Sequence, residues 1–210
     1  FRTGDIDIAM SVPSEVATNA EYEPNIVMPE KYVSNYFVLI NSGPKAQVEA
    51  LKDENVRKAL ALAIDKDTML NILGGKANVR LDGYIPYGFE GVDGNDFRDE
   101  KNYGEFNLEE AKALMEAAGY NENNHLKFEY LYSNSQFHAD VAQILQQMWQ
   151  KVGINCELTV VESGVFYNQV DNGDYEVSRY GYSAGDDPSQ FLNLWTTGQQ
   201  IVASVDDPTY

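Results

Sequence analysis

The sequence is poor in cysteine, histidine and basic residues, and each shortage excludes a class of protein. The single cysteine, Cys156, excludes an internal disulfide, and its place in an alternating apolar run indicates a buried thiol. The two histidines, His125 and His138, lie far apart without a partner at metal-ligand spacing, so we expect no metal site. No apolar run reaches the length of a transmembrane helix.

The charge balance excludes partners that need a basic surface. Fifteen basic residues stand against 33 acidic ones, a net charge of −18, and we therefore expect neither nucleic acid nor an anionic membrane surface as a partner. There is no glycine-rich phosphate loop and no GxSxG motif, so we expect no cofactor and no enzyme activity. A hydrolase that works through a carboxylate pair remains the alternative, because such a pair is not visible in sequence.

Alternating strand and helix patterns predict one α/β lobe with helices covering a sheet. We interpret residues 1–210 as a single lobe cut from a longer protein, with an irregular excursion at about 76–104. Gly119 and Gly173 are expected to end helices, and Asn55 and Asn107 to cap them. The expected strands are 4–10, 36–41, 126–132, 154–161 and 175–182. The expected helices are 13–19, 56–64, 69–73, 108–118, 137–152, 164–171 and one that begins at Pro188.

The stretch 176–195, EVSRYGYSAGDDPSQFLNLW, is the strongest candidate for a binding site. It reads as a strand, a polar turn and a helix that Asp187 caps, and ligands usually bind in such a crevice at the carboxyl edge of a sheet. Arg179 and Asp186 offer both charges, and His138 follows another strand at the same edge. This combination favours a ligand with two charges, such as a peptide. A capped helix beside a solvated loop is the alternative interpretation.

Several segments, in the same order along nearly the whole chain, resemble one protein family. The chain resembles the carboxyl-terminal lobe of the extracytoplasmic oligopeptide- and dipeptide-binding proteins of ABC importers, solute-binding protein family 5. The segments are GDIDIA from Gly4, YFVLIN from Tyr36, NVRKALALAIDKDTML from Asn55, FNLEEAKALMEAAGY from Phe106, FEYLYSNSQFHADVAQILQQMWQKVGI from Phe128 and GDYEVSRYGYSAGDDPSQFL from Gly173.

The resemblance implies one lobe, with a mixed sheet, of a two-lobed type II periplasmic-binding-protein fold that closes on its ligand by hinge motion. His138 and Arg179 match positions that resemble the family's acceptors for a peptide carboxylate, and Tyr182 stands where the family commonly has tryptophan. The family's turn carries an aspartate that receives the peptide amine. Here the turn is one residue shorter, so Gly185 stands at that position and Asp186 is expected to substitute. The implied ligand-binding residues are His138, Arg179, Tyr182, Ser183, Ala184, Gly185 and Asp186.

The same resemblance implies what the protein does and where it works. It predicts a receptor that captures peptides outside the membrane, either in the periplasm or lipid-anchored at the cell surface. The implied partners are the peptide, the membrane permease of the importer and the amino-terminal lobe of the same chain. Related members bind nickel chelates, haem or oligosaccharides, and these remain alternative cargoes.

Overall fold

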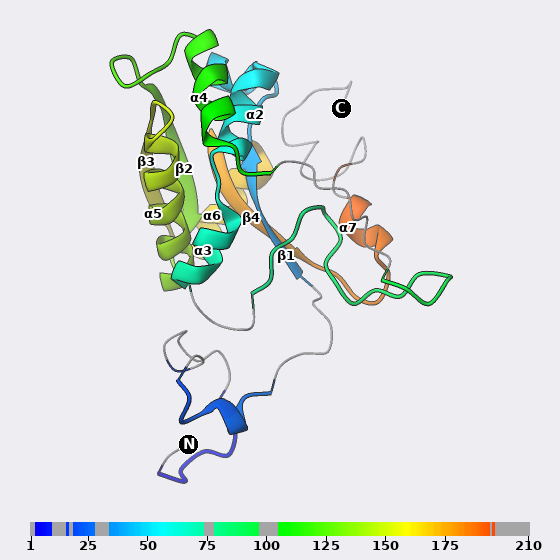
Figure 1. Cartoon of the computed structure of the whole chain (residues 1–210). Coiled ribbons are helices and arrows are strands. Elements are labelled where there is room, and N and C mark those ends of the chain that lie inside the picture. The colour runs from blue at the N-terminus through cyan, green and yellow to red at the C-terminus, as the bar shows by residue number, and fades with distance from the viewer. Residues whose placement is uncertain are drawn as a thin grey trace.

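The computed structural model describes residues 3–9, 16, 19–27, 34–73, 78–96, 105–193 and 195. Four strands form one sheet in the order β1-β4-β2-β3 (Figure 1). β2 is parallel to both of its neighbours, whereas β1 is antiparallel to β4, so the predicted mixed sheet is confirmed. The strands span Ser34–Ile40 (β1), Leu126–Ser133 (β2), Ile154–Val161 (β3) and Val177–Ser183 (β4).

Helices cover both faces of the sheet. In Figure 1, α2, α4 and α5 lie in front of the strands and α6 lies behind them. The α-helices span Glu54–Leu62 (α2), Lys66–Leu73 (α3), Leu108–Ala117 (α4), Gln136–Gln150 (α5), Ser163–Asn172 (α6) and Ser189–Asn193 (α7). Two short 3-10 helices span Glu23–Asn25 (η1) and Glu49–Lys52 (η2).

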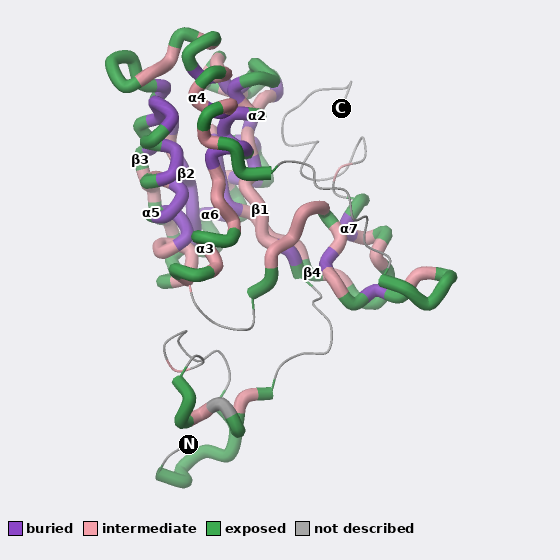
Figure 2. The backbone as a smooth tube through the Cα atoms, viewed as in Figure 1, coloured by how far each residue is buried: buried purple, intermediate pink, exposed green. Residues whose placement is uncertain are grey.

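The larger part of the core lies between the sheet and helices α2, α4 and α5. Trp149 of α5 is fully buried, and its ring meets Phe128 and Tyr130 of β2 edge to face. Its indole nitrogen donates to the Leu60 carbonyl at 3.0 Å, which joins α5 to the last turn of α2. Burying each such side chain contributes about 1.5–3 kcal/mol, so this layer dominates the stability of the fold. Figure 2 shows the buried stripe along α5.

A smaller core lies on the other face, where Phe166 and Val170 of α6 pack against Leu39 and Leu131. Because side chains alternate between the faces of a strand, β2 contributes Tyr130 to one core and Leu131 to the other. The sheet is therefore a layer between two helical layers of unequal thickness.

Most of the expected elements are present, with boundaries shifted by one to three residues. Asn107 caps α4 as expected, since its side-chain oxygen accepts from the Glu110 amide at 3.1 Å. Gly173 ends α6 in the left-handed conformation with φ 75°, also as expected.

The cap of α2 was predicted wrongly. The cap is Asp53, whose carboxylate accepts from the Asn55 amide at 2.8 Å, whereas we had expected Asn55. A carboxylate two positions earlier satisfies the first free amides and gains from the helix dipole.

The strand expected at 4–10 is also wrong for the residues that the structure describes. Residues 3–9 form turns and bends, and Ile8 is 79% exposed. Alternation predicts a strand only where a partner strand and a core cover one face, and no described strand pairs with this segment. Of the helix expected at 13–19, only Val16, which is helical, and Asn19, which is not, lie within the described residues.

The described part of the excursion, 78–96, forms no helix or strand beyond an isolated bridge between Glu90 and Asp96. It lies beside α7, near the end of β4 and the start of β1 (Figure 1). Phe89 is buried there against Phe191 of α7, with ring centroids 5.7 Å apart. This contact holds the excursion next to the polar turn that follows β4.

Candidate ligand-binding site

The sheet opens at the carboxyl end of β4. β2 and β3 pair along their whole length, from Leu126 opposite Ile154 to Ser133 opposite Val161. β2 and β4, in contrast, are in register only at Tyr130 with Val177 and Leu131 with Ser178. Beyond that point, residues 179–183 of β4 pair with β1 on one side, and no described strand pairs with them on the other. The two parallel strands therefore diverge where the predicted site residues begin.

Arg179 is the first residue of β4 beyond this divergence. Its side chain is only 6% exposed, and its guanidinium lies 4.1 Å above the ring of Phe166 on α6. One terminal nitrogen donates a short hydrogen bond to the hydroxyl of Ser133, the last residue of β2. The guanidinium therefore lies between the separated ends of the two strands.

The positive charge of Arg179 is poorly satisfied by the protein. Its Nε is buried without a hydrogen-bond partner, and within the described ranges no carboxylate forms an ion pair with it. Buried charges are normally paired, because an unpaired one loses its hydration without replacement. A ligand carboxylate could supply the missing partner through two parallel hydrogen bonds.

His138 lies at the start of α5, next to Tyr36 of β1. Its Nδ1 is 3.4 Å from the Tyr36 hydroxyl, and the two rings are 5.6 Å apart between centroids. Burial, together with the positive charge of Arg179, lowers the pKa of His138 to about 4. Burial raises the pKa of Tyr36 to about 12, against the opposing effect of Arg179. Both side chains are therefore neutral near pH 7.

Two of the predicted residues, His138 and Arg179, are close enough for the charge of Arg179 to lower the pKa of His138. Tyr36 contacts His138, and Ser133 accepts a hydrogen bond from Arg179. The sequence reasoning missed these two additional residues. Ser133 could have been found as the last residue of a strand that ends at the same edge as Arg179. Tyr36 gave no such signal, because it begins an apolar run that reads as core.

The polar turn after β4 is held by its own hydrogen bonds. Asp187 accepts from the Ser189 amide at 2.9 Å, as expected of a cap, and hydrogen bonds from the Ser189 side chain and amide lower the pKa of Asp187. The Gly185 amide donates to the Gln190 side chain at 3.4 Å. Of the predicted residues, Ser183, Gly185 and Asp186 are exposed and Ala184 is half-buried.

Tyr182 connects the end of β4 to its surroundings on both sides. Its ring meets Phe191 edge to face at 5.8 Å, and its amide donates to the Asn35 side chain at 3.1 Å. Asn35 in turn donates to the Tyr84 carbonyl at 2.8 Å, so the excursion is tied to the same corner. The position of the turn relative to a ligand remains a prediction.

A cavity near these residues lies on the α5 face of the sheet. It has a volume of about 640 Å³ and a mainly apolar lining that includes Tyr36, Met69, Phe137 and Trp149. In the part of the chain that the structure describes, its lining does not include His138, Arg179 or the turn 183–186. Tyr36 lines this cavity and also contacts His138, so the cavity lies next to the group formed by His138, Arg179, Tyr36 and Ser133.

The structure also bears on three other features: a metal site, a reactive cysteine and a membrane-spanning helix. Within the described ranges, no group of three or more His, Cys, Asp or Glu could hold a metal ion. Burial raises the pKa of the Cys156 thiol to about 12, which keeps it protonated. Among the described residues, no helix has the length and apolar character needed to cross a membrane.

Comparisons with known proteins identify the family. The model of the bacterial extracellular solute-binding proteins, family 5 Middle, matches residues 1–202. The periplasmic oligopeptide-binding protein OppA of Escherichia coli is 31% identical over 208 residues, which cover 96% of this chain and 37% of OppA. The dipeptide-binding protein DppE of Bacillus subtilis is 26% identical over 209 residues, which cover 96% of this chain and 37% of DppE.

A solved structure extends the comparison to the fold. The crystal structure of Haemophilus influenzae OppA in complex with RPPGFSPFR superposes with a TM-score of 0.74 at 25% identity, covering 97% of this chain and 40% of that one. The chain thus spans about two fifths of the length of the relatives it matches. These relatives are binding proteins. The family model matches nearly the entire sequence, and this match shows which family the chain belongs to. The chain belongs to the bacterial extracellular solute-binding proteins, family 5.

Proposed function

We propose that this chain forms part of the peptide-binding component of an ABC importer. In this proposal it captures peptides outside the membrane, without chemistry of its own, and delivers them to a membrane permease. The names of its relatives support a peptide cargo, since they include oligopeptide- and dipeptide-binding proteins. The capture would take place in the periplasm or at the cell surface, with the protein anchored by lipid.

The observation that carries the proposal is the buried guanidinium of Arg179. It is only 6% exposed, has an Nε without a partner, and lies at the carboxyl edge of the sheet. The Ser133 hydroxyl and the face of Phe166 hold it in place without neutralising it. A peptide carboxylate is the small anion that fits this need, because it accepts two hydrogen bonds from the guanidinium fork.

The unpaired side of β4 offers a second attachment point for a peptide. Residues 179–183 have backbone groups on the side where β2 has diverged, and an extended peptide can add to such an edge as a strand. Main-chain pairing gives affinity that depends little on sequence. This arrangement suits a receptor that accepts many peptides.

The other end of the peptide would be held by the turn after β4. We propose that Asp186, with the backbone of Ser183, Ala184 and Gly185, receives the peptide amine, and that Tyr182 lies against the ligand. The negative net charge of −18 fits the capture of a cationic group. The missing contacts would come from the amino-terminal lobe of the full receptor, which would close over the peptide by hinge motion.

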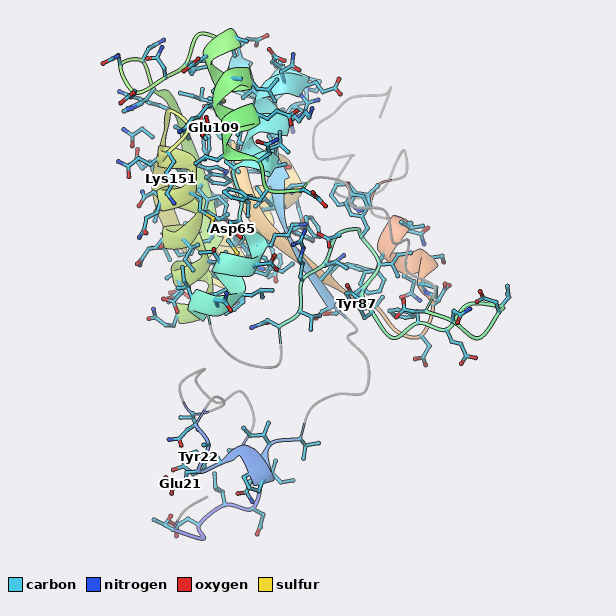
Figure 3. All side chains as sticks on the ribbon, viewed as in Figure 1. Glu21, Tyr22, Asp65, Tyr87, Glu109 and Lys151 are labelled. Carbon is cyan, nitrogen blue, oxygen red and sulfur yellow. The ribbon has the colours of Figure 1, made fainter. Side chains whose placement is uncertain are left out.

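Isothermal titration calorimetry of the full-length receptor with a pool of tripeptides tests the proposal. We expect Arg179→Ala to raise the Kd by about five- to 150-fold, which corresponds to about 1–3 kcal/mol for a lost charged hydrogen bond. Lys151→Ala is the matched control, because it removes an exposed positive charge at the far end of α5 (Figure 3).

Capped peptides show which end each residue holds. The effect of Arg179→Ala should disappear with peptides amidated at the carboxyl end, and the effect of Asp186→Ala with peptides acetylated at the amine. Equal losses for capped and free peptides would remove these residues from the proposed contacts. Unchanged affinity in both variants would count against a peptide site at this edge.

A further inference from the structure

His138 has neighbours that fix both its charge and its orientation. It lies at the start of α5, half-buried, with its Nδ1 facing the hydroxyl of Tyr36 on β1 at 3.4 Å. The Phe137 ring packs against both, with its centroid 5.8 Å from that of Tyr36 and 5.9 Å from that of His138. The three rings therefore form one cluster at the start of α5, and the Tyr36 hydroxyl faces one nitrogen of the imidazole.

The charged and titratable groups around His138 come from three strands and from its own helix. Tyr36 faces it from β1, Arg179 of β4 acts on it through its positive charge, and Tyr130 of β2 lies against Tyr36. On α5 itself, the Asp140 carboxylate accepts from the Gln136 amide at 2.7 Å. Among the described residues, Arg179 is the only charge that shifts the proton affinity of His138, and burial acts in the same direction.

The direction of the hydrogen bond between Tyr36 and Nδ1 sets which nitrogen of the neutral His138 carries the hydrogen. Burial raises the pKa of Tyr36 to about 12, so its hydroxyl keeps its proton throughout the physiological range. A neutral imidazole has one donor and one acceptor nitrogen. If the hydroxyl donates to Nδ1, the hydrogen of His138 stands on Nε2, which is then a donor available to a ligand.

We propose that Tyr36 is a positioning residue for His138, and that a ligand carboxylate entering beside Arg179 causes His138 to take up a proton from solvent. This inference rests on the proposed function above and adds a proton to the binding reaction. The proton adds to Nδ1, and the Tyr36 oxygen changes from donor to acceptor by rotation of its hydroxyl. No covalent bond other than N–H is made.

The physical reason is the change of charge at the site. In the empty lobe, His138 is neutral because burial and the positive charge of Arg179 oppose its protonation. A bound carboxylate neutralises Arg179 and adds a negative charge nearby, and both changes favour the imidazolium. The bound state then holds more protons than the free state, so the affinity increases as the pH falls from about 7 towards 5.

The experiment is calorimetry of the full-length receptor with one tripeptide, as the free acid and as the carboxyl-terminal amide. Titrations at pH 5.0 and 7.5, in buffers of different ionisation enthalpy, give both the Kd and the number of protons taken up. For the free acid we expect a Kd about tenfold lower at pH 5.0 and net proton uptake. For the carboxyl-terminal amide we expect the same Kd at both pH values and no proton uptake beyond that of groups elsewhere in the receptor.

Variants separate His138 from other titrating groups. His138→Gln should abolish the proton uptake and the pH dependence that is specific to the free acid. His125→Gln, at the chain's other histidine, which is exposed, should leave both unchanged. Tyr36→Phe should weaken binding more at pH 7.5 than at pH 5.0, because the imidazolium donates from both nitrogens and no longer needs the tyrosine to select one. If Tyr36 had only a structural role, Tyr36→Phe would weaken binding equally at pH 7.5 and pH 5.0.

The outcomes also separate this inference from the proposed function. If Arg179→Ala weakens the free acid but wild-type binding takes up no proton, the coupling is wrong and the peptide site stands. If proton uptake persists in His138→Gln, another group is responsible and the inference fails. If neither the carboxyl group of the peptide nor Arg179 affects the affinity, the proposed function itself fails.

Discussion

Two buried polar side chains, Asn41 beside the start of β4 and Arg179 where β4 separates from β2, have opposite environments. Asn41 is fully buried, and its amide donates to the carbonyls of Gly173 and Tyr175 at 3.1 and 3.0 Å. Its side-chain oxygen accepts from the Gly43 amide at 3.2 Å. Arg179 is almost as buried but has only the Ser133 hydroxyl as a hydrogen-bond partner among the described residues, and its Nε has none.

The difference separates a region of the sheet that serves folding from the region where we propose the binding site. At the Asn41 end, the protein satisfies every polar atom of the side chain, which is the normal condition for a buried amide. At the Arg179 end, a charge that costs free energy to bury is kept next to an open strand edge. Such a group is expected where a ligand completes the hydrogen bonds.

Removal of Asn41 should give the largest loss of stability. Asn41→Ala leaves two buried carbonyls and one amide without partners, and we expect the free energy of unfolding to fall by about 3 kcal/mol. Urea denaturation followed by circular dichroism measures the change. A loss below about 1 kcal/mol would mean that water replaces the side chain, and the contrast with Arg179 would weaken.

Acidification should give an intermediate effect through His138. Its pKa in the folded state is about 4, below its ordinary value of about 6.5, so the folded state binds fewer protons than the unfolded state. The stability from this group is complete above about pH 6.5 and is lost as the pH falls towards 4. Because His138 is only half-buried, we expect a loss of about 1 kcal/mol.

Urea denaturation at pH 7.5 and 4.5 measures this pH effect. The loss specific to His138 is the difference between the wild type and His138→Gln, since carboxylates titrate in both. His125→Gln should retain the whole effect. An equal pH dependence in the wild type and His138→Gln would show that neither burial nor Arg179 lowers the pKa of this histidine in solution.

Replacement of Arg179 should have the smallest effect on stability. Arg179→Met keeps the length of the side chain and its packing over Phe166 but removes the charge. We expect the free energy of unfolding to stay within about 1 kcal/mol of the wild type, or to rise, because the desolvation of the guanidinium is relieved. A loss as large as that of Asn41→Ala would assign Arg179 a structural role.

Much of the fold could be predicted because local patterns agree with packing. The stripe of α5, which includes Val141 and Trp149, predicted a helix with one buried face, and that face forms the core. The alternation in β2 and β3 predicted strands in the same way. The pattern failed at Ile6 and Ile8, where the described residues offer no partner strand and the alternation therefore buries nothing.

The candidate site was only partly predictable. Arg179 was identified as a cation within the predicted strand 175–182 and His138 as a polar residue just after a strand, and the family resemblance selected the same two. That Arg179 is buried without a carboxylate could not be predicted, because it depends on where β2 and β4 separate. The neighbours Tyr36 and Ser133 come from strands that are distant in sequence and meet only in the sheet.

The sequence by itself determined the elements, their faces and the family, because apolar periodicity and helix caps act over a few residues. The tertiary structure alone decided which polar side chains are satisfied. Hydrogen bonds and charges depend on distances between residues far apart in the chain, and the divergence of two strands sets those distances here. For this reason Asn41, at the end of one strand, and Arg179, within another, have different environments although both read as polar residues in the sequence.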